Sequence, residues 1–146
     1  MNIMLLSPSG SFASALESLP LDGERDHVAL VTATASDSEA ATTLIRLGAA
    51  ALPARSRLAR ALERSVIGRN IKRLSPLDGG WRFASAARRS TELRRAAAEA
   101  DLIIALERDS ALAAWQVLHR WARPGARGLS GLASGRALLT SRRGAR

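Results

Sequence analysis

The chain has 146 residues, of which 47% are hydrophobic and 24% charged, the size and composition of one globular domain. It has no cysteine, which excludes disulfides, thiolate metal sites and cysteine nucleophiles, and no apolar run near the roughly 20 residues that span a bilayer. The first residues lack the basic segment and cleavage site of a signal peptide, so we expect a cytoplasmic protein, at most peripheral to a membrane.

The formal net charge of +9 is concentrated in the last two thirds of the chain. Residues 1–45 contain one basic residue and six acids, whereas residues 46–100 contain thirteen basic residues and four acids. Of the 22 basic residues 21 are arginines, and there are 29 alanines, a usage that a GC-rich genome produces by default. The positive charge is therefore explained either by binding of a polyanion or by base composition.

The first part of the chain predicts a strand, a helix and a second strand. Residues 1–6 (MNIMLL) are apolar and end at Ser-Pro, which is typical of a buried strand. Ser11 is placed to cap a helix over residues 12–19. Residues 27–35 (HVALVTATA) are rich in Val and Thr and predict the next strand.

The middle of the chain predicts further helices and one short strand. Ser36 or Ser38 would cap a helix over residues 40–47, which Gly48 would end. Residues 49–52, before a proline, predict a short third strand. Residues 54–72 carry leucines, valine and isoleucine at helical spacing with arginines on the other faces, which predicts a basic amphipathic helix.

The last part of the chain again predicts helices that alternate with a strand. Residues 81–100 are helical in pattern, in two pieces that meet near Ser90-Thr91. Residues 101–106 (DLIIAL) predict a buried strand, and residues 111–121 predict the helix that follows it. Strands that alternate with helices indicate a parallel sheet.

We therefore predict an α/β fold: a small Rossmann-like three-layer domain with a short, mainly parallel sheet of three or four strands flanked by helices. The domain is expected to cover residues 1–128. Residues 129–146 are rich in Gly, Ser and Arg and are expected to form a partly mobile C-terminal tail.

Polar loops follow two of the predicted strands. Ser7-Pro8-Ser9-Gly10-Ser11 has neither the GxxxxGK[ST] nor the GxGxxG pattern, so it is either a tight turn or a ligand contact at a helix N-terminus. Glu107-Arg108-Asp109-Ser110 directly follows DLIIAL. If the first strand lies between the second strand and DLIIAL, both loops line one cleft where the strand order reverses. The candidate cleft residues are Ser7, Ser9, Gly10, Ser11, Glu107, Arg108, Asp109 and Ser110.

Glu107 is the candidate catalytic group of this cleft, as a base or as an acceptor for a ligand hydroxyl, and Arg108 could hold an anion. The alternative is that Asp109 or Ser110 caps the next helix and Arg108 is solvated. His27 and His119 are too isolated to indicate a metal site, and we expect no cofactor.

A basic stretch with aromatic residues is the third candidate feature. Arginine-rich helices with a nearby tryptophan can lie on anionic membranes or bind nucleic-acid phosphates, the second being the less favoured partner here. The alternative is a solvated helix face whose apolar stripe belongs to the core. The candidate residues are Arg55, Arg57, Arg60, Arg64, Arg69, Lys72, Trp81 and Arg82.

The N-terminal NIMLLSPSGS, the Val- and Thr-rich second strand and AEADLIIALERDSALAAW together resemble the N-terminal half of GT-B glycosyltransferases, in the style of glycosyltransferase-like proteins of high-GC actinobacteria. The resemblance covers residues 1–123 and is one of layout. It implies an acceptor-binding domain whose first loop and whose loop after DLIIAL face the interdomain cleft. The second Rossmann half, with its nucleotide-sugar site, has no counterpart in this chain.

We therefore expect a glycosyltransferase-like accessory or interaction domain that needs a partner for the nucleotide-sugar site. A second hypothesis is a non-enzymatic basic protein that binds a polyanion, either an anionic membrane surface or nucleic acid. A third is a protein that assembles with copies of itself through its basic amphipathic helices.

Overall fold

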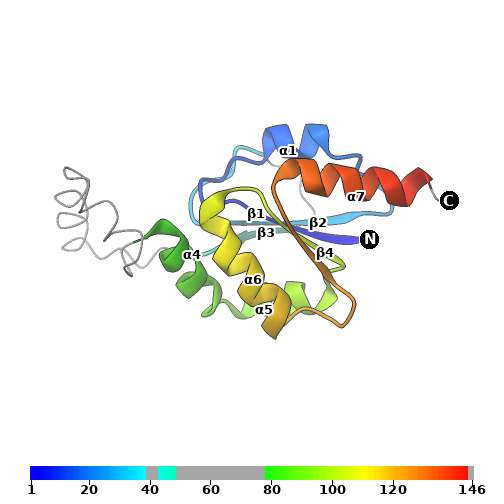
Figure 1. Cartoon of the computed structure of the whole chain (residues 1–146). Helices are drawn as coiled ribbons and strands as arrows, with labels where there is room; N and C mark the ends of the chain where they lie inside the picture. Colours follow the sequence, from blue (N-terminus) through cyan, green and yellow to red (C-terminus); the bar gives the residue numbers. More distant parts are fainter. Residues whose placement is uncertain (39–42, 49–77, 145–146) are drawn as a thin grey trace.

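The computed structural model describes residues 1–38, 43–48 and 78–144, and its centre is a parallel sheet (Figure 1). Five strands in these residues are arranged in the order β3-β2-β1-β4-β5, and every neighbouring pair is parallel. The strands are β1 (Asn2–Leu6), β2 (His27–Thr32), β3 (Thr43–Arg46), β4 (Leu102–Ala105) and β5 (Arg127–Ser130).

Helices cover both faces of the sheet. Figure 1 shows α1 and α7 on one face and α4, α5 and α6 on the other, so the domain has three layers. The helices are α1 (Ala13–Ser18), α4 (Gly79–Ala87), α5 (Thr91–Glu99), α6 (Ala111–Arg120) and α7 (Leu132–Gly144), and a 3₁₀ turn, η1 (Arg108–Ser110), precedes α6. The predicted α/β class and the flanked parallel sheet are confirmed.

The core lies in two layers because successive side chains of a strand point to opposite faces. In β1, Met4 and Leu6 belong to the apolar cluster on the side of α4, α5 and α6. Ile3 and Leu5 belong to the cluster that includes Phe12 and residues of α7. Near-continuous apolar strands are typical of a parallel sheet covered on both faces, which explains why MNIMLL and DLIIAL were recognisable in the sequence.

The predicted number of strands was too low, because the two edge strands carry weak signals. β5 is Arg-Gly-Leu-Ser, and only Leu129 is partly buried in it. It nevertheless pairs with β4 in the register Ile104↔Leu129. The predicted domain boundary at residue 128 falls inside this strand.

Residues expected to form a tail instead form the end of β5 and the helix α7. The helix packs on the sheet through Leu139, which is 3% exposed, and through Gly135. A Cβ atom at Gly135 would lie 2.6 Å from Cδ1 of Ile104, so glycine is what allows this close approach of α7 to β4. The composition of this stretch concealed a helix that tertiary packing stabilises.

The helix predicted over residues 40–47 was wrong. Thr43–Arg46 form the edge strand β3, paired with β2 in the register Leu30↔Leu44. Ile45 is fully buried against the sheet, and a run this short fits either periodicity. The strand predicted at 49–52 and the basic helix predicted at 54–72 lie outside the described residues.

The two-piece helix expected over residues 81–100 is confirmed as α4 and α5. The Ser90 hydroxyl accepts a hydrogen bond from the backbone N–H of Leu93, at 3.1 Å, and so caps α5. Asp78 does the same for α4, accepting from the N–H of Gly80 at 3.2 Å. A new cap at Ser90 is the local reason that one helical pattern makes two helices.

Candidate functional site

The candidate site lies where the order of the strands reverses. β1 is flanked by β2 on one side and by β4 on the other, as the sequence hypothesis required. The loop Ser7–Ser11 after β1 and the segment Leu106–Ser110 after β4 therefore meet at the carboxyl edge of the sheet. In open α/β sheets this is the position at which ligands bind.

The Glu107 carboxylate joins the two loops. Its Oε1 atom accepts hydrogen bonds from the hydroxyls of Ser7 and Ser9, the second at 2.5 Å. The backbone N–H of Ser9 also points to Oε1, at 3.4 Å. Side chains about a hundred residues apart in the chain thus form one polar cluster, which brings together Ser7, Ser9 and Glu107 of the residues that the sequence proposed.

A row of serine hydroxyls leads from this carboxylate to the surface. Ser7 is fully buried, and its Oγ accepts a hydrogen bond from the backbone N–H of Ser11, at 3.2 Å. The Oγ atoms of Ser7 and Ser9 are 3.3 Å apart, and those of Ser9 and Ser11 are 3.2 Å apart; because Ser9 donates its single proton to Glu107, it accepts from the hydroxyl of Ser11. Ser9 and Ser11 are exposed. The cluster therefore has a buried end at Ser7 and an end that a ligand can reach.

Gly10 sets the shape of the loop. Its φ is +82°, and a Cβ atom there would lie 2.0 Å from the carbonyl oxygen of Ala35. Thr34 donates a hydrogen bond from Oγ1 to the carbonyl oxygen of Ser9, at 2.6 Å. The segment after β2 thus holds the loop after β1 in place, which keeps the serine hydroxyls oriented.

The N-terminus of α1 is already occupied by a carboxylate. Oδ1 of Asp37 accepts from the backbone N–H of Phe12 at 2.7 Å and of Ala13 at 3.1 Å. The cap that the sequence assigned to Ser11 was wrong: Phe12 is the N-cap residue, and no side chain of its own caps the helix. Asp37 reaches these amides only because β2 lies beside β1, so no local pattern could reveal it.

Ser110 and Asp109 take structural positions beside the cluster. The buried Ser110 hydroxyl donates to the carbonyl oxygen of Glu107 at 2.6 Å and accepts from its N–H at 3.3 Å. A Cβ atom at Gly79 would lie 2.5 Å from Oδ2 of Asp109, so α4 begins directly against this side chain. Arg108 is exposed. Of the four residues after β4, Glu107 is the one whose side chain joins the serine loop.

Thr34, Asp37 and the Gly79-Gly80 pair belong to the surroundings of this site and were not among the sequence candidates. The signal that could have found the first two is the polar run that follows the β2 strand, at the same edge of the sheet as Ser7 and Glu107.

Only part of the candidate basic surface lies within the described residues. Trp81 and Arg82 are both exposed, in the first turn of α4. Arg55, Arg57, Arg60, Arg64, Arg69 and Lys72 lie outside the residues that the structure describes.

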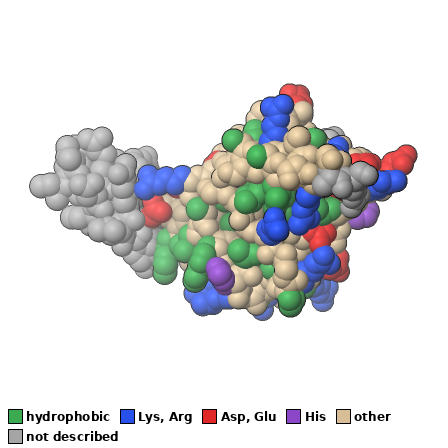
Figure 2. Space-filling view, turned by 45° about the vertical axis from the view of Figure 1, so that its right-hand side comes forward, with side chains coloured by type: hydrophobic (Ala, Val, Ile, Leu, Met, Phe, Trp, Pro, Cys, Tyr) green, Lys and Arg blue, Asp and Glu red, His purple; other side chains and the backbone are tan. Residues whose placement is uncertain are grey.

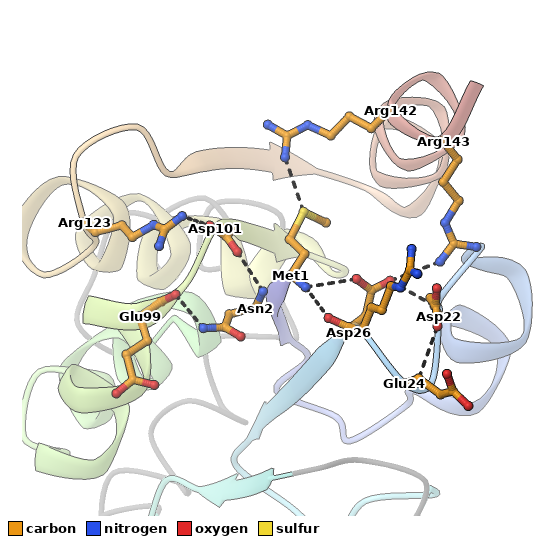
Figure 3. Close-up of polar contacts among 11 residues, drawn as sticks. Met1, Asn2, Asp22, Glu24, Asp26, Glu99, Asp101, Arg123, Arg142 and Arg143 are labelled. Atoms are coloured by element: carbon orange, nitrogen blue, oxygen red, sulfur yellow. Dashed lines mark hydrogen bonds and ion pairs between the residues drawn. The ribbon is translucent and has the colours of Figure 1, made fainter. Parts of the chain in front are cut away.

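A second polar cluster lies at the amino edge of the sheet, opposite the candidate site (Figure 3). The Asp26 carboxylate accepts from the Asp22 N–H at 2.9 Å and pairs with the Met1 ammonium at 3.2 Å and with Arg143 of α7 at 3.1 Å. Burial acts to raise the pKa of Asp26, but the Asp22 hydrogen bond, the Met1 ammonium and Arg143 together hold it below its ordinary value. Each partner comes from a different element, so this cluster joins chain segments.

Within the described ranges, no group of His, Asp and Glu side chains is arranged to hold a metal ion. The helices in these ranges include none with the length and apolar character to cross a membrane. No protein-family model matches the chain, and neither a curated protein nor a solved structure matches it significantly. The function proposed for the chain therefore depends on the geometry of its site.

Proposed function

We propose that the chain is a ligand-binding module of the kind found as the acceptor-side half of GT-B glycosyltransferases, and that its cluster of Ser7, Ser9, Ser11 and Glu107 binds the hydroxyl groups of a sugar-like ligand. The observation that carries this proposal is the placement of the Glu107 carboxylate among the hydroxyls of Ser7 and Ser9 at the strand-order reversal. It deepens the expectation from the sequence, which left the ligand class open.

The chemistry of the cluster favours a neutral, hydroxyl-bearing ligand over an anion. A carboxylate accepts strong hydrogen bonds from hydroxyl groups, and serine hydroxyls can both donate and accept. A phosphate at the same place would meet the negative charge of Glu107. The backbone amides of Phe12 and Ala13, which could otherwise attract a phosphate, are bonded to Asp37.

The proposed role is accessory, because a sugar-transfer reaction also needs a donor site. In this proposal Glu107 accepts a hydrogen bond from the ligand hydroxyl and is the candidate base for it. A partner protein would supply the nucleotide-sugar site.

The test measures the binding of neutral sugars, sugar phosphates and nucleotide sugars to the protein by thermal shift and by calorimetry. Neutral sugars should stabilise the protein, and the phosphorylated compounds should do so less. Glu107→Gln and Ser9→Ala should each weaken binding by roughly 10- to 100-fold, the worth of a hydrogen bond to a charged group.

Glu17→Gln is the matched control, because Glu17 is an exposed glutamate of α1 outside the cluster, and it should leave binding unchanged. Circular dichroism verifies that each variant is folded. The proposal is wrong if no neutral sugar binds the wild-type protein, or if binding is the same in folded Glu107→Gln.

A further inference from the structure

Two tryptophan side chains are exposed on neighbouring helices. Among the described residues the exposed large hydrophobic side chains are Trp81 in α4, 47% exposed, and Trp115 in α6, 55% exposed. Tryptophan is strongly buried on average in folded proteins, so two exposed indoles on neighbouring helices call for an explanation.

The two tryptophans lie on helices that pack side by side on the same face of the sheet (Figure 1). The first turn of α4 lies against Asp109, just before α6 begins, so the starts of both helices are close together. The ring of His119 lies against Trp115 with the ring centres 4.8 Å apart. Figure 2 shows hydrophobic side chains gathered at the surface beside a histidine and basic side chains. We call this surface the tryptophan face; it consists of Trp81, Trp115, His119, Arg82, Arg88, Arg89 and Arg120.

Basic side chains outnumber acidic ones around the tryptophan face, where Asp78 and Asp109 lie at the starts of α4 and α6. Residues 79–91 and 111–127 include six arginines, His119 and neither Asp nor Glu. Arg123 pairs with Asp101, and Arg127 lies in β5. The exposed arginines of the two helices and the turn after α4 are Arg82, Arg88, Arg89 and Arg120. The charge of this region is complementary to an anionic partner.

We propose that the tryptophan face docks on an anionic lipid surface, with both indoles at the headgroup level and the arginines near the lipid phosphates. Amphipathic aromatic rings favour the membrane–water interface, and basic side chains add attraction to anionic lipids. Such a contact needs a surface and no groove.

Nucleic acid is the competing anionic partner, and the geometry favours it less. Base stacking uses an open face of the aromatic ring, and His119, tilted at 49° with its ring centre 4.8 Å away, occupies part of the surface of the Trp115 ring. The lipid proposal uses none of the residues of the proposed sugar-binding cluster, so either proposal can fail without the other.

The first experiment is flotation of the full chain with vesicles of phosphatidylcholine alone and of phosphatidylcholine mixed with phosphatidylglycerol. Binding is expected only with phosphatidylglycerol, and it should fall as salt is raised. Tryptophan emission should shift to shorter wavelength on binding. Trp121 is half-buried with Arg94 at 5.6 Å from its ring, so the shift should disappear in Trp81→Phe/Trp115→Phe, which retains Trp121.

Charge position is tested with two triple variants of equal net charge. Arg82→Gln/Arg88→Gln/Arg89→Gln should lower the partition coefficient on phosphatidylglycerol vesicles by about a hundredfold, given the attraction of each basic residue near such a surface. The control variant replaces three exposed arginines outside the tryptophan face by glutamine, and its partition coefficient should fall far less. The control positions are Arg25, Arg46 and Arg136.

Three results would overturn the proposal: no binding to phosphatidylglycerol vesicles, equal binding to neutral vesicles, or equal loss in the two triple variants. The nucleic-acid alternative replaces it if Trp81→Ser/Trp115→Ser abolishes binding of a single-stranded oligonucleotide but leaves vesicle binding intact. A second copy is the occupant if the same pair of changes only converts a dimer to a monomer, measured by light scattering.

Discussion

At the scale of single residues, the candidate site depends on Gly10, which shapes the loop Ser7–Ser11, and on the Glu107 carboxylate, which binds the serine hydroxyls of that loop. Gly10 has a positive φ and lies against the Ala35 carbonyl, and Glu107 binds the hydroxyls that the resulting loop presents. Ser7 is fully buried, so water cannot reach its hydroxyl. The hydroxyl therefore depends on Glu107 and on the Ser11 N–H for its hydrogen bonds. The same contacts that could receive a ligand also hold the loop together.

Gly10→Ala should lower the free energy of unfolding by roughly 2–4 kcal/mol, because it adds a backbone collision to an unfavourable φ. Urea denaturation measures the change. Gly131→Ala is the control, since Gly131 has a φ of +83° and open space around it, and it should cost only about 1 kcal/mol. Equal losses in the two variants would show that the contact with Ala35 contributes nothing.

At the scale of elements, α1 shows how a short helix is held by its neighbours. It has six residues, too few to be stable alone, and it has no cap of its own. Asp37 bonds its first amides from the segment after β2, and Phe12 at its start is fully buried. The helix is therefore a product of the β1–β2 pairing more than of its own sequence.

Asp37→Ala should lower the free energy of unfolding by about 1–2 kcal/mol, the usual worth of a helix N-cap, and Asp37→Asn should recover most of it. Ser11→Ala, at the residue that local sequence favours as the cap, should change stability by less than about 0.5 kcal/mol. Chemical denaturation compares the three. A larger loss in Ser11→Ala than in Asp37→Ala would contradict the assignment of the cap.

At the scale of the whole molecule, the two edges of the sheet have different roles. The carboxyl edge carries the candidate site, whereas at the amino edge Asp26 joins Met1, just before β1, to the end of α7 (Figure 3). The α7 helix is thereby fixed at its far end as well as by Leu139 on the sheet.

Stability should fall in acid as Asp26 is protonated. Because the pKa of Asp26 is lower in the folded protein than the ordinary aspartate value of 3.8, its contribution is complete above that value and is lost as the pH falls through the folded pKa. Asp26→Asn should therefore be less stable than the wild type at neutral pH, with the difference shrinking as the pH falls below 3.8. Thermal unfolding as a function of pH measures this.

Arg143→Gln should lower the stability at neutral pH by less than Asp26→Asn does, because Met1 and the Asp22 N–H remain to stabilise the Asp26 carboxylate. A difference between wild type and Asp26→Asn that stays constant from neutral pH into acid would show that the carboxylate charge is not what stabilises this edge.

The sequence by itself determined the class of fold, the two central strands and the two loops of the candidate site. Met1–Leu6 and DLIIAL are apolar over nearly their whole length because parallel strands covered by helices on both faces meet no water. The polar residues that follow them were therefore interpretable as one edge of the sheet, and Ser7, Ser9 and Glu107 do lie together there.

Only the tertiary structure decided the edge strands, the helix α7, the cap of α1 and the position of the tryptophan face. β3 and β5 have four residues each. The local pattern fitted a helix or a strand at β3 and predicted no element at β5, and pairing with β2 and β4 makes both segments strands. Asp37 and the α4–α6 surface depend on contacts between segments far apart in the chain. Such contacts leave no periodic signal, because the energy that stabilises them arises only when the segments meet.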